Sequence, residues 1–195
     1  MLKGPGLRAR KKLQVREELA AAAMKLFGKR GFDAVTVDEI VAAVDVSRRS
    51  FFRYFPTKEA VFFARRADQT QKMRALLDAP QPGERPFDTV QRALLTLGDQ
   101  QLEQRAQVLT EHRIAAKTPH LLARDLEFDR EATTAIALAL ARGAKSPARI
   151  HRARLAAGAM IGMLRVVIED WVASGATSNL RKAGARAIAL IRPLA

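Results

Sequence analysis

The sequence has no cysteine, and no stretch of it approaches the run of about 20 apolar residues that a transmembrane helix needs. Without cysteine there can be no disulfides, thiolate metal sites or thiol nucleophiles, and we expect a protein of the reducing cytoplasm. The missing apolar run predicts no membrane partner. Strand signals are also scarce, because no segment sustains a period-two alternation, so the predicted fold class is all-α.

Motifs for catalysis and metal binding are missing as well. The three histidines, His112, His120 and His151, lie at no metal-ligand spacing. No nucleophile motif or glycine-rich phosphate loop accompanies them. The sequence therefore predicts no enzyme, no metal site and no cofactor.

What the sequence has in excess is positive charge. Its 195 residues carry a formal net charge of +14, and residues 1–66 hold 15 Lys/Arg against 7 Asp/Glu. One third of the chain thus carries more than half of the net charge, which favours a polyanionic partner such as nucleic acid. The alternative is a basic surface that only keeps the protein in solution.

Glycine, proline and capping residues divide the chain into three parts. Residues 1–12 are predicted to be a basic flexible arm, residues 13–60 a small helical domain, and residues 61–195 a larger helical domain. The expected helices cover residues 13–29, 37–44, 48–54, 58–77, 87–104, 107–116, 121–141, 149–173 and 180–191. The helix that starts at residue 58 is the only element that we expect to belong to both domains.

Two short helices in the basic third have the spacing of a helix-turn-helix. Thr36 stands three residues before Glu39, as in a capping box, and Ser47 offers a second helix N-cap after a tight turn. Of nine phenylalanines, seven lie between residues 27 and 63, which predicts an aromatic core. Phe51 and Phe55 are four residues apart and should be buried together.

The residues of this region resemble those of the tetracycline-repressor (TetR) family. The resemblance rests on Leu26-Phe27, Gly31-Phe32, Thr36-Val37, Ile40, Val46-Ser47 and the run Phe51-Phe52-Arg53-Tyr54-Phe55-Pro56-Thr57-Lys58-Glu59. It implies a bacterial repressor that binds palindromic double-stranded operator DNA and is released by a small-molecule effector. It also implies that residues 13–60 are a helix-turn-helix DNA-binding domain and that residues 61–195 are an all-α ligand-binding and dimerisation domain. The homodimer would form through the last two helices.

Carried over by position, the resemblance implies DNA contacts at Thr36, Ser47, Arg48, Arg49, Phe52, Arg53, Tyr54 and Lys58. Thr36, Tyr54 and Lys58 would contact phosphates. Arg48 and Arg49 would face base edges, where a guanidinium can pair with guanine O6 and N7, and the alternative for each is a phosphate contact or a solvated charge.

Two positions depart from the family pattern. Asp45 stands in the turn where glycine is common, and Asp tolerates the left-handed conformation better than most residues. Phe52 stands where tyrosine is common, so it lacks a hydroxyl for phosphate but can touch a thymine methyl.

The ligand pocket is expected among the helices between residues 65 and 141. Its candidate lining residues are Met73, Leu76, Leu77, Leu94, Leu97, Leu109 and Phe128. Because this half has few aromatic residues, the expected effector is aliphatic or resembles an acyl-CoA. The basic arm either reaches the DNA or stays solvated, and a sequence-tolerant architectural DNA-binding protein is the alternative function.

Overall fold

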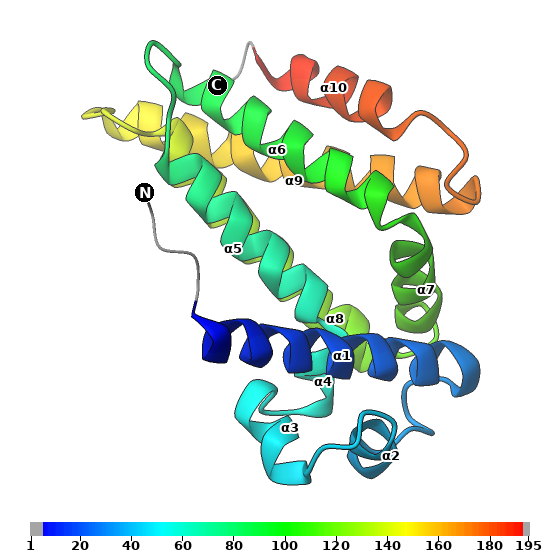
Figure 1. Ribbon diagram of the computed structural model, residues 1–195. Coiled ribbons are helices and arrows are strands. Elements are labelled where there is room, and N and C mark those ends of the chain that lie inside the picture. The colour runs from blue at the N-terminus through cyan, green and yellow to red at the C-terminus, as the bar shows by residue number, and fades with distance from the viewer. Residues whose placement is uncertain (1–5, 193–195) are drawn as a thin grey trace. The chain divides into compact units, whose positions relative to one another are not determined.

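The computed structural model describes residues 6–192, which form ten α-helices and no strand within that range (Figure 1). The predicted all-α fold class is confirmed. The helices are α1 (Leu7–Arg30), α2 (Val37–Ala42), α3 (Arg48–Tyr54), α4 (Lys58–Phe62), α5 (Ala64–Asp78), α6 (Pro86–Glu103), α7 (Arg105–Ala115), α8 (Pro119–Leu140), α9 (Pro147–Ala173) and α10 (Leu180–Ile191). None of these helices is long and apolar enough to cross a membrane.

The first helix is longer than the sequence suggested. It begins at Leu7, so residues 7–12, which we expected in the flexible arm, form its first turns. The physical reason is that Gly6 is followed by residues with good helix propensity and by no further glycine or proline until Gly28. Its end agrees with the sequence, because Gly31 follows it with a φ of 84°. Residues 1–5 of the predicted arm lie outside the described residues.

The predicted helix over residues 58–77 is divided in two. Phe63 leaves the helical pattern with φ −87° and ψ 13°, and its N–H still bonds to the carbonyl oxygen of Glu59. Both Phe62 and Phe63 are buried with their rings 4.9 Å apart at a right angle. No propensity signal marks this break.

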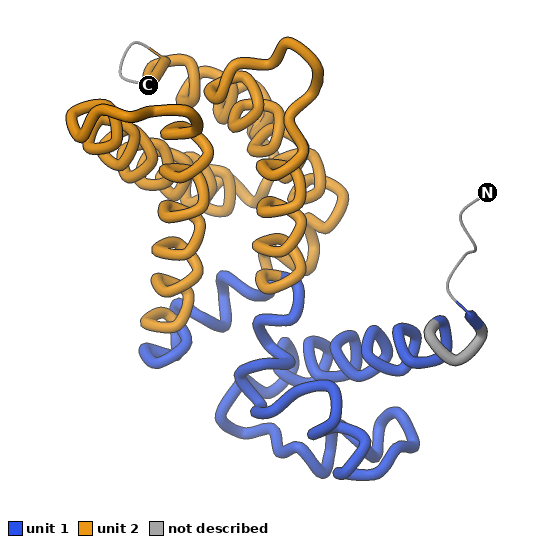
Figure 2. Tube along the Cα trace, turned by 90° about the vertical axis from the view of Figure 1, so that its left-hand side faces the viewer, with its two compact units in different colours: residues 1–65, 110–121 blue, residues 66–109, 122–195 orange. Residues whose placement is uncertain are grey.

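The chain divides into two compact units, coloured separately in Figure 2. Unit 1 comprises Met1–Arg65 and Thr110–Leu121, and unit 2 comprises Arg66–Leu109 and Leu122–Ala195. The expected boundary after residue 60 thus differs by five residues, and the unit 1 segment 110–121 had no counterpart in the sequence prediction.

The core of unit 1 is aromatic, as its sequence predicted. The side chains of Phe27 and Phe51 are fully buried, and those of Phe32, Phe55 and Phe62 are nearly so. The rings of Phe27 and Phe32 lie 5.0 Å apart, and those of Phe51 and Phe55 lie 5.8 Å apart. Such aromatic pairs contribute about 0.5–1.5 kcal/mol beyond their area burial.

Residues 110–121 pack against other residues of unit 1 that are distant in sequence. A Cβ on Gly28 of α1 would lie 3.2 Å from Cγ2 of Thr110, so the glycine permits a close approach. The guanidinium of Arg65 donates to the carboxylate of Glu111 at 2.8 and 3.0 Å, and both side chains are about nine-tenths buried. The expectation that one helix alone belongs to both domains was therefore wrong, because α5, α7 and α8 each have residues in both units, whereas α4 lies within unit 1.

Unit 2 has an aliphatic core. Its larger buried cluster joins α5, α6, α8, α9 and α10 and includes Met73, Leu77, Ile136, Met160 and Ile188. The last helix, α10, lies along α6 and α9 (Figure 1). A second, smaller cluster surrounds Trp171 with Val108, Ala176 and Leu180.

Candidate nucleic-acid interface

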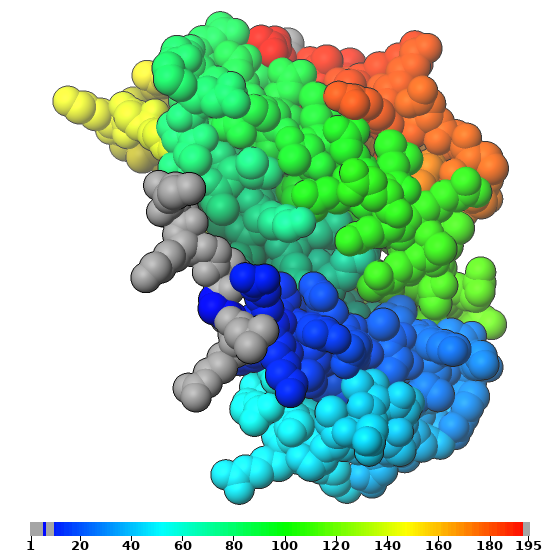
Figure 3. All heavy atoms as spheres, viewed as in Figure 1, coloured from blue at the N-terminus to red at the C-terminus, as the bar shows by residue number. Residues whose placement is uncertain are grey.

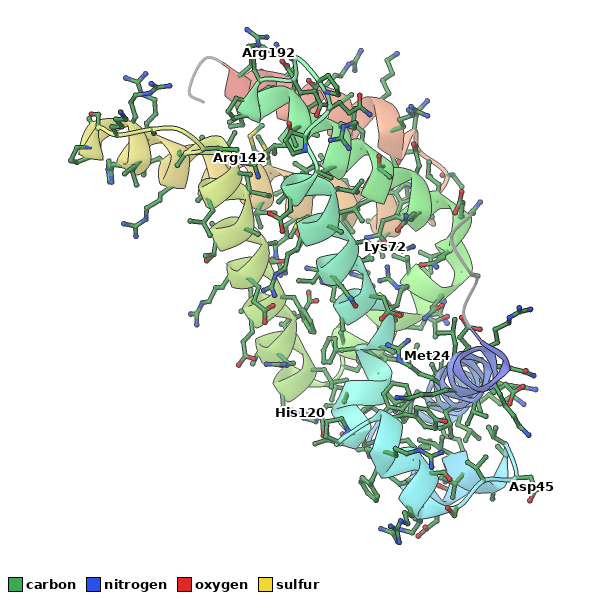
Figure 4. All side chains as sticks on the ribbon, turned by 60° about the vertical axis from the view of Figure 1, so that its left-hand side comes forward. Met24, Asp45, Lys72, His120, Arg142 and Arg192 are labelled. Atoms are coloured by element: carbon green, nitrogen blue, oxygen red, sulfur yellow. The ribbon has the colours of Figure 1, made fainter. Side chains whose placement is uncertain are left out.

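The turn between α2 and α3 is built around a left-handed residue. Asp45 lies in this turn (Figure 4). Its φ is 54°, which confirms that aspartate adopts the left-handed conformation for which glycine is favoured. The turn is closed by the N–H groups of Val44 and Val46, which both bond to the carbonyl oxygen of Val41. This geometry fixes the direction in which α3 leaves α2.

The two faces of α3 separate as predicted. Phe51 and the following Phe55 are buried at 0% and 2% exposure, whereas Phe52 is 45% exposed. Arg48, Arg49 and Arg53 are also exposed. In the space-filling view, the cyan atoms, which include those of α3, lie at the surface (Figure 3). The helix thus presents cations and one aromatic ring to solvent.

Thr36 and Ser47 use their hydroxyl groups to start helices. The Thr36 hydroxyl accepts from the N–H of Glu39 at 3.3 Å, and the Thr36 N–H donates to the Glu39 carboxylate at 2.8 Å, so the predicted capping box is present. Ser47 accepts from the N–H of Ser50 at 3.1 Å. The Thr36 N–H and the Arg30 guanidinium, together with the Thr36 hydroxyl, lower the pKa of Glu39 to about 2.

Lys58 bonds to the backbone of the loop between α1 and α2. Its ammonium donates to the carbonyl oxygens of Phe32 and Val35 at 3.0 and 2.9 Å, and it lies 4.3 Å from the centre of the Phe32 ring. Two of its three N–H groups are therefore used to hold the loop between α1 and α2. The sequence had suggested only a phosphate contact here.

The three arginines of α3 have different surroundings. Arg48 donates to Asp38 of α2 at 3.0 Å and lies 6.0 Å from the centre of the Phe52 ring. Arg53 donates to the Tyr54 hydroxyl at 3.2 Å and stacks on that ring. Among the described residues, Arg49 has no hydrogen-bonding or ionic partner. Sequence reasoning missed Asp38, because a pair ten residues apart across a turn leaves no periodic signal.

The candidate pocket residues of unit 2 fall into separate places. Met73 and Leu77 are buried in the larger aliphatic cluster, and Leu76, Leu94 and Leu97 pack against it. Leu109 packs instead against the cluster around Trp171. Phe128 is buried, and the guanidinium of Arg124 lies 5.3 Å from the centre of its ring.

A cleft of about 490 Å³ opens elsewhere, on the surface formed by α5 and α8. Of the predicted pocket residues it contains only Leu77. Its full lining is Arg74, Leu77, Asp78, Arg130, Glu131, Thr134, Ala135, Leu138, Ala139 and Arg142. The cleft therefore differs from the predicted apolar pocket, because half of its lining residues are charged.

Comparison with known proteins gives consistent matches. Residues 19–64 match the family model described as bacterial regulatory proteins, tetR family. The HTH-type transcriptional regulator TcmR of Streptomyces glaucescens is 35% identical over 134 residues, which cover 66% of this chain and 59% of TcmR. The chain therefore matches less than two thirds of that relative's length.

Two solved structures are similar along most of the chain. A TetR-like transcriptional regulator from Rhodococcus sp. RHA1 has a TM-score of 0.59 and 23% identity, with 91% of this chain and 93% of that chain covered. Thermus thermophilus FadR, a TetR-family repressor solved in complex with lauroyl-CoA, has a TM-score of 0.57 and 24% identity, with coverages of 91% and 93%. These similarities show that the fold is shared over about nine-tenths of the chain.

Proposed function

The chain belongs to the tetR family of bacterial regulatory proteins, and from this premise we propose that it is a transcriptional repressor that binds operator DNA and releases it when a small molecule binds to unit 2. The curated relative TcmR is a transcriptional regulator, so the activity is binding and not catalysis. Because bacterial DNA lies in the cytoplasm, the protein acts there.

The observation that carries the proposal is the outer face of α3. Arg49 is exposed and unpaired among the described residues, so its guanidinium is available to guanine O6 and N7 without breaking an existing bond. Phe52 offers an apolar surface for a thymine methyl on the same helix. We therefore assign base reading to Arg49 and Phe52.

Arg48 has a second role in this proposal. Asp38 of the neighbouring helix α2 is a positioning residue, because its carboxylate holds the guanidinium of Arg48 in one direction. An oriented arginine reads one base position, whereas a freely rotating one also binds nearby phosphates. Asp38 thus lowers the affinity for DNA of any sequence and improves the discrimination between sequences.

The remaining site residues are assigned to phosphates. Thr36 and Ser47 begin α2 and α3, and the chain reaches the DNA backbone there through exposed N-terminal turns. Arg53 and Tyr54 stack on each other at the end of α3. Lys58 keeps one N–H for a phosphate after bonding to two carbonyl oxygens.

We further propose a homodimer through α9 and α10, which places two α3 helices on a palindromic operator. Leu155, Gly158, Gly162 and Val166 follow each other at helical spacing on α9, and all four are exposed. A Cβ on either glycine would meet no described atom within 4 Å, so a partner helix could approach closely. Leu190 of α10 is 68% exposed and extends the apolar surface.

The effector is proposed to bind in the aliphatic interior of unit 2. The side chains packed there include methionine, leucine and isoleucine, which suit an aliphatic body, such as that of an acyl-CoA-like molecule. Phe87 and Phe128 are the only phenylalanines in this half of the sequence.

The experiment that tests the function compares two kinds of DNA. A genome-wide footprint of the purified protein identifies the operator, and fluorescence anisotropy then measures binding to operator and to random DNA at several salt concentrations. We expect operator binding to be at least about 10³-fold tighter. Arg49→Ala should cost about 1–3 kcal/mol on the operator and little on random DNA.

Lys145→Ala is the matched control, because it removes one exposed cation from the loop before α9. It should leave the specificity ratio unchanged. Equal affinity of the wild-type protein for both DNAs would instead support a sequence-tolerant architectural protein and contradict the repressor.

A further inference from the structure

A ring of four charged side chains joins three helices inside unit 2. Arg66 of α5 donates to Asp125 of α8 at 3.1 Å and also contacts Asp129. Arg165 of α9 donates to Asp129 at 2.8 Å and reaches Asp125 at 3.4 Å. All four side chains are about three-quarters buried or more. Each arginine thus faces two aspartates, and the ring has no net charge.

One helical turn further along α5 lies a buried amide without a partner. Gln69 is 7% exposed, and among the described residues its Nε2 finds no hydrogen-bond acceptor. A buried donor left unpaired costs about 1–3 kcal/mol. Such donors are few in native proteins, so each needs a specific explanation, and binding of a ligand is one. The other such nitrogen, Nε1 of Trp171, lies in the separate cluster around Val108.

Gln69 stands at the border between the charged ring and the aliphatic core. Arg66 precedes it by three residues, and Met73, which is buried in that core, follows by four, so all three share one face of α5. Three of the five methionines in the sequence, Met73, Met160 and Met163, belong to the same core. Methionine side chains are flexible, so this region can rearrange to bind a ligand.

We propose that the effector is a neutral molecule with an aliphatic body whose carbonyl oxygen accepts a hydrogen bond from the Gln69 amide. An ester, thioester or ketone has this chemistry. A free carboxylate is disfavoured, because both arginines of the ring are already neutralised and a new buried anion would have no counter-ion. This inference rests on the proposed function, since it names the ligand class of that regulator's effector site.

The test uses three probes with similar chains: methyl decanoate, decanoate and undecane. Dissociation constants for the full-length protein are measured through the fluorescence of the single tryptophan, Trp171, and through the ligand-induced shift of the melting temperature. We expect methyl decanoate to bind at least about ten-fold more tightly than either of the other two. Tighter binding of decanoate, or no binding of methyl decanoate, would overturn the proposal.

The variant Gln69→Leu keeps the volume of the side chain and removes its donors. It should weaken methyl decanoate binding about ten-fold, to the level of undecane, while the ligand-free protein melts at the same or a higher temperature. Gln71→Leu, on an exposed position of the same helix, should bind the ester as the wild-type protein does. A lower melting temperature for ligand-free Gln69→Leu than for Gln71→Leu would show that the amide already has a partner, and would reject the site.

Operator binding is measured separately on the same three proteins. Methyl decanoate that binds through Gln69 but leaves operator affinity unchanged would support the site and contradict release by an effector. If the wild-type protein bound operator and random DNA equally well, the proposed function would be contradicted, while the ligand measurement would still stand.

Discussion

The two units of this protein hold their helices together by different means. In unit 1, α2, α3 and α4 are five to seven residues long, and each begins at a hydroxyl side chain that accepts an N–H from its own first turn. In unit 2, the long helices α6 and α9 begin with proline and have no side-chain cap. Short helices are unstable alone, so unit 1 depends on local caps and on its aromatic core.

Ion pairs show the same difference. Unit 1 pairs Arg30 with Glu39 and Arg48 with Asp38 over nine or ten residues of sequence, whereas Arg66 in unit 2 reaches its partners over about sixty. Arg65 and Glu111 of unit 1, which are 46 residues apart, are an exception. Unit 2 also has local pairs, such as Arg92 with Glu84. The distant pairs of Arg66 are what tie its helices α5 and α8 together, and they cannot be found from sequence spacing.

The largest effect should come from the aromatic core of unit 1. Phe51→Ala removes a fully buried ring and should cost about 3–5 kcal/mol. The neighbouring Phe52→Ala removes a ring that is 45% exposed and should change stability by about 0.5 kcal/mol or less. Hydrogen exchange of residues 19–64, followed by mass spectrometry, measures both. Similar losses for the two variants would contradict the division of α3 into a buried and an exposed face.

The next effect concerns the charged ring of unit 2. Asp129→Asn leaves Arg66 and Arg165 with Asp125 as their common aspartate, and it should destabilise unit 2 by about 1–3 kcal/mol, since the ring is only partly screened by solvent. Glu131→Gln on the same helix opens the exposed pair with Arg74 and should cost about 0.5 kcal/mol at most. Urea unfolding followed by Trp171 fluorescence separates the two, and equal midpoints would show that the ring contributes nothing.

The sequence allowed most of the fold to be predicted, because capping residues, prolines and glycines mark helix ends. The bounds of α3 and α10 agree with the prediction, and those of α6 to α9 differ by at most two residues. The faces of α3 followed from the four-residue spacing of Phe51 and Phe55. The left-handed conformation of Asp45 was expected because the resembling family commonly has glycine at that position.

What could not be predicted depends on contacts between distant residues. The packing of residues 110–121 into unit 1 needs Gly28, Arg65 and Glu111 to meet in space, and nothing local in the sequence brings them together. The bonding of Lys58 to two carbonyl oxygens is equally invisible, because backbone acceptors leave no mark in a sequence. The same holds for the unpaired amide of Gln69.

A smaller effect should follow from freeing Arg48. Asp38→Asn removes the partner of Arg48 and one negative charge close to α3, the helix that we propose reads the DNA. Binding to random DNA should therefore tighten by about 0.2–1 kcal/mol, while the ratio of operator to random binding falls. Anisotropy at two salt concentrations measures this. Glu103→Gln, at an exposed position of α6, controls for net charge. The same tightening in Glu103→Gln would mean that Asp38 does not position Arg48.

The smallest effect should appear only in acid, and it compares one carboxylate from each unit. The pKa of Glu39 is lowered to about 2 by the Thr36 N–H, by Arg30 and by the Thr36 hydroxyl, and that of Glu84 to about 2 by Arg92 and by the Gln81 N–H. Both values lie below the ordinary 4.5. Each carboxylate therefore contributes stability that is complete above pH 4.5 and is lost as the pH falls toward 2.

Protonation of Glu39 should open the capping box and increase hydrogen exchange in α2, whereas protonation of Glu84 should do so at the start of α6. Exchange followed between pH 5 and pH 2.5, corrected for the intrinsic rate at each pH, resolves the two sites. Glu39→Gln should remove the acid response of α2 and leave that of α6 unchanged, and Glu84→Gln should do the reverse. Because each carboxylate bonds within ten residues of itself, loosening that spread from one unit to the other in either variant would contradict the local character of these contacts.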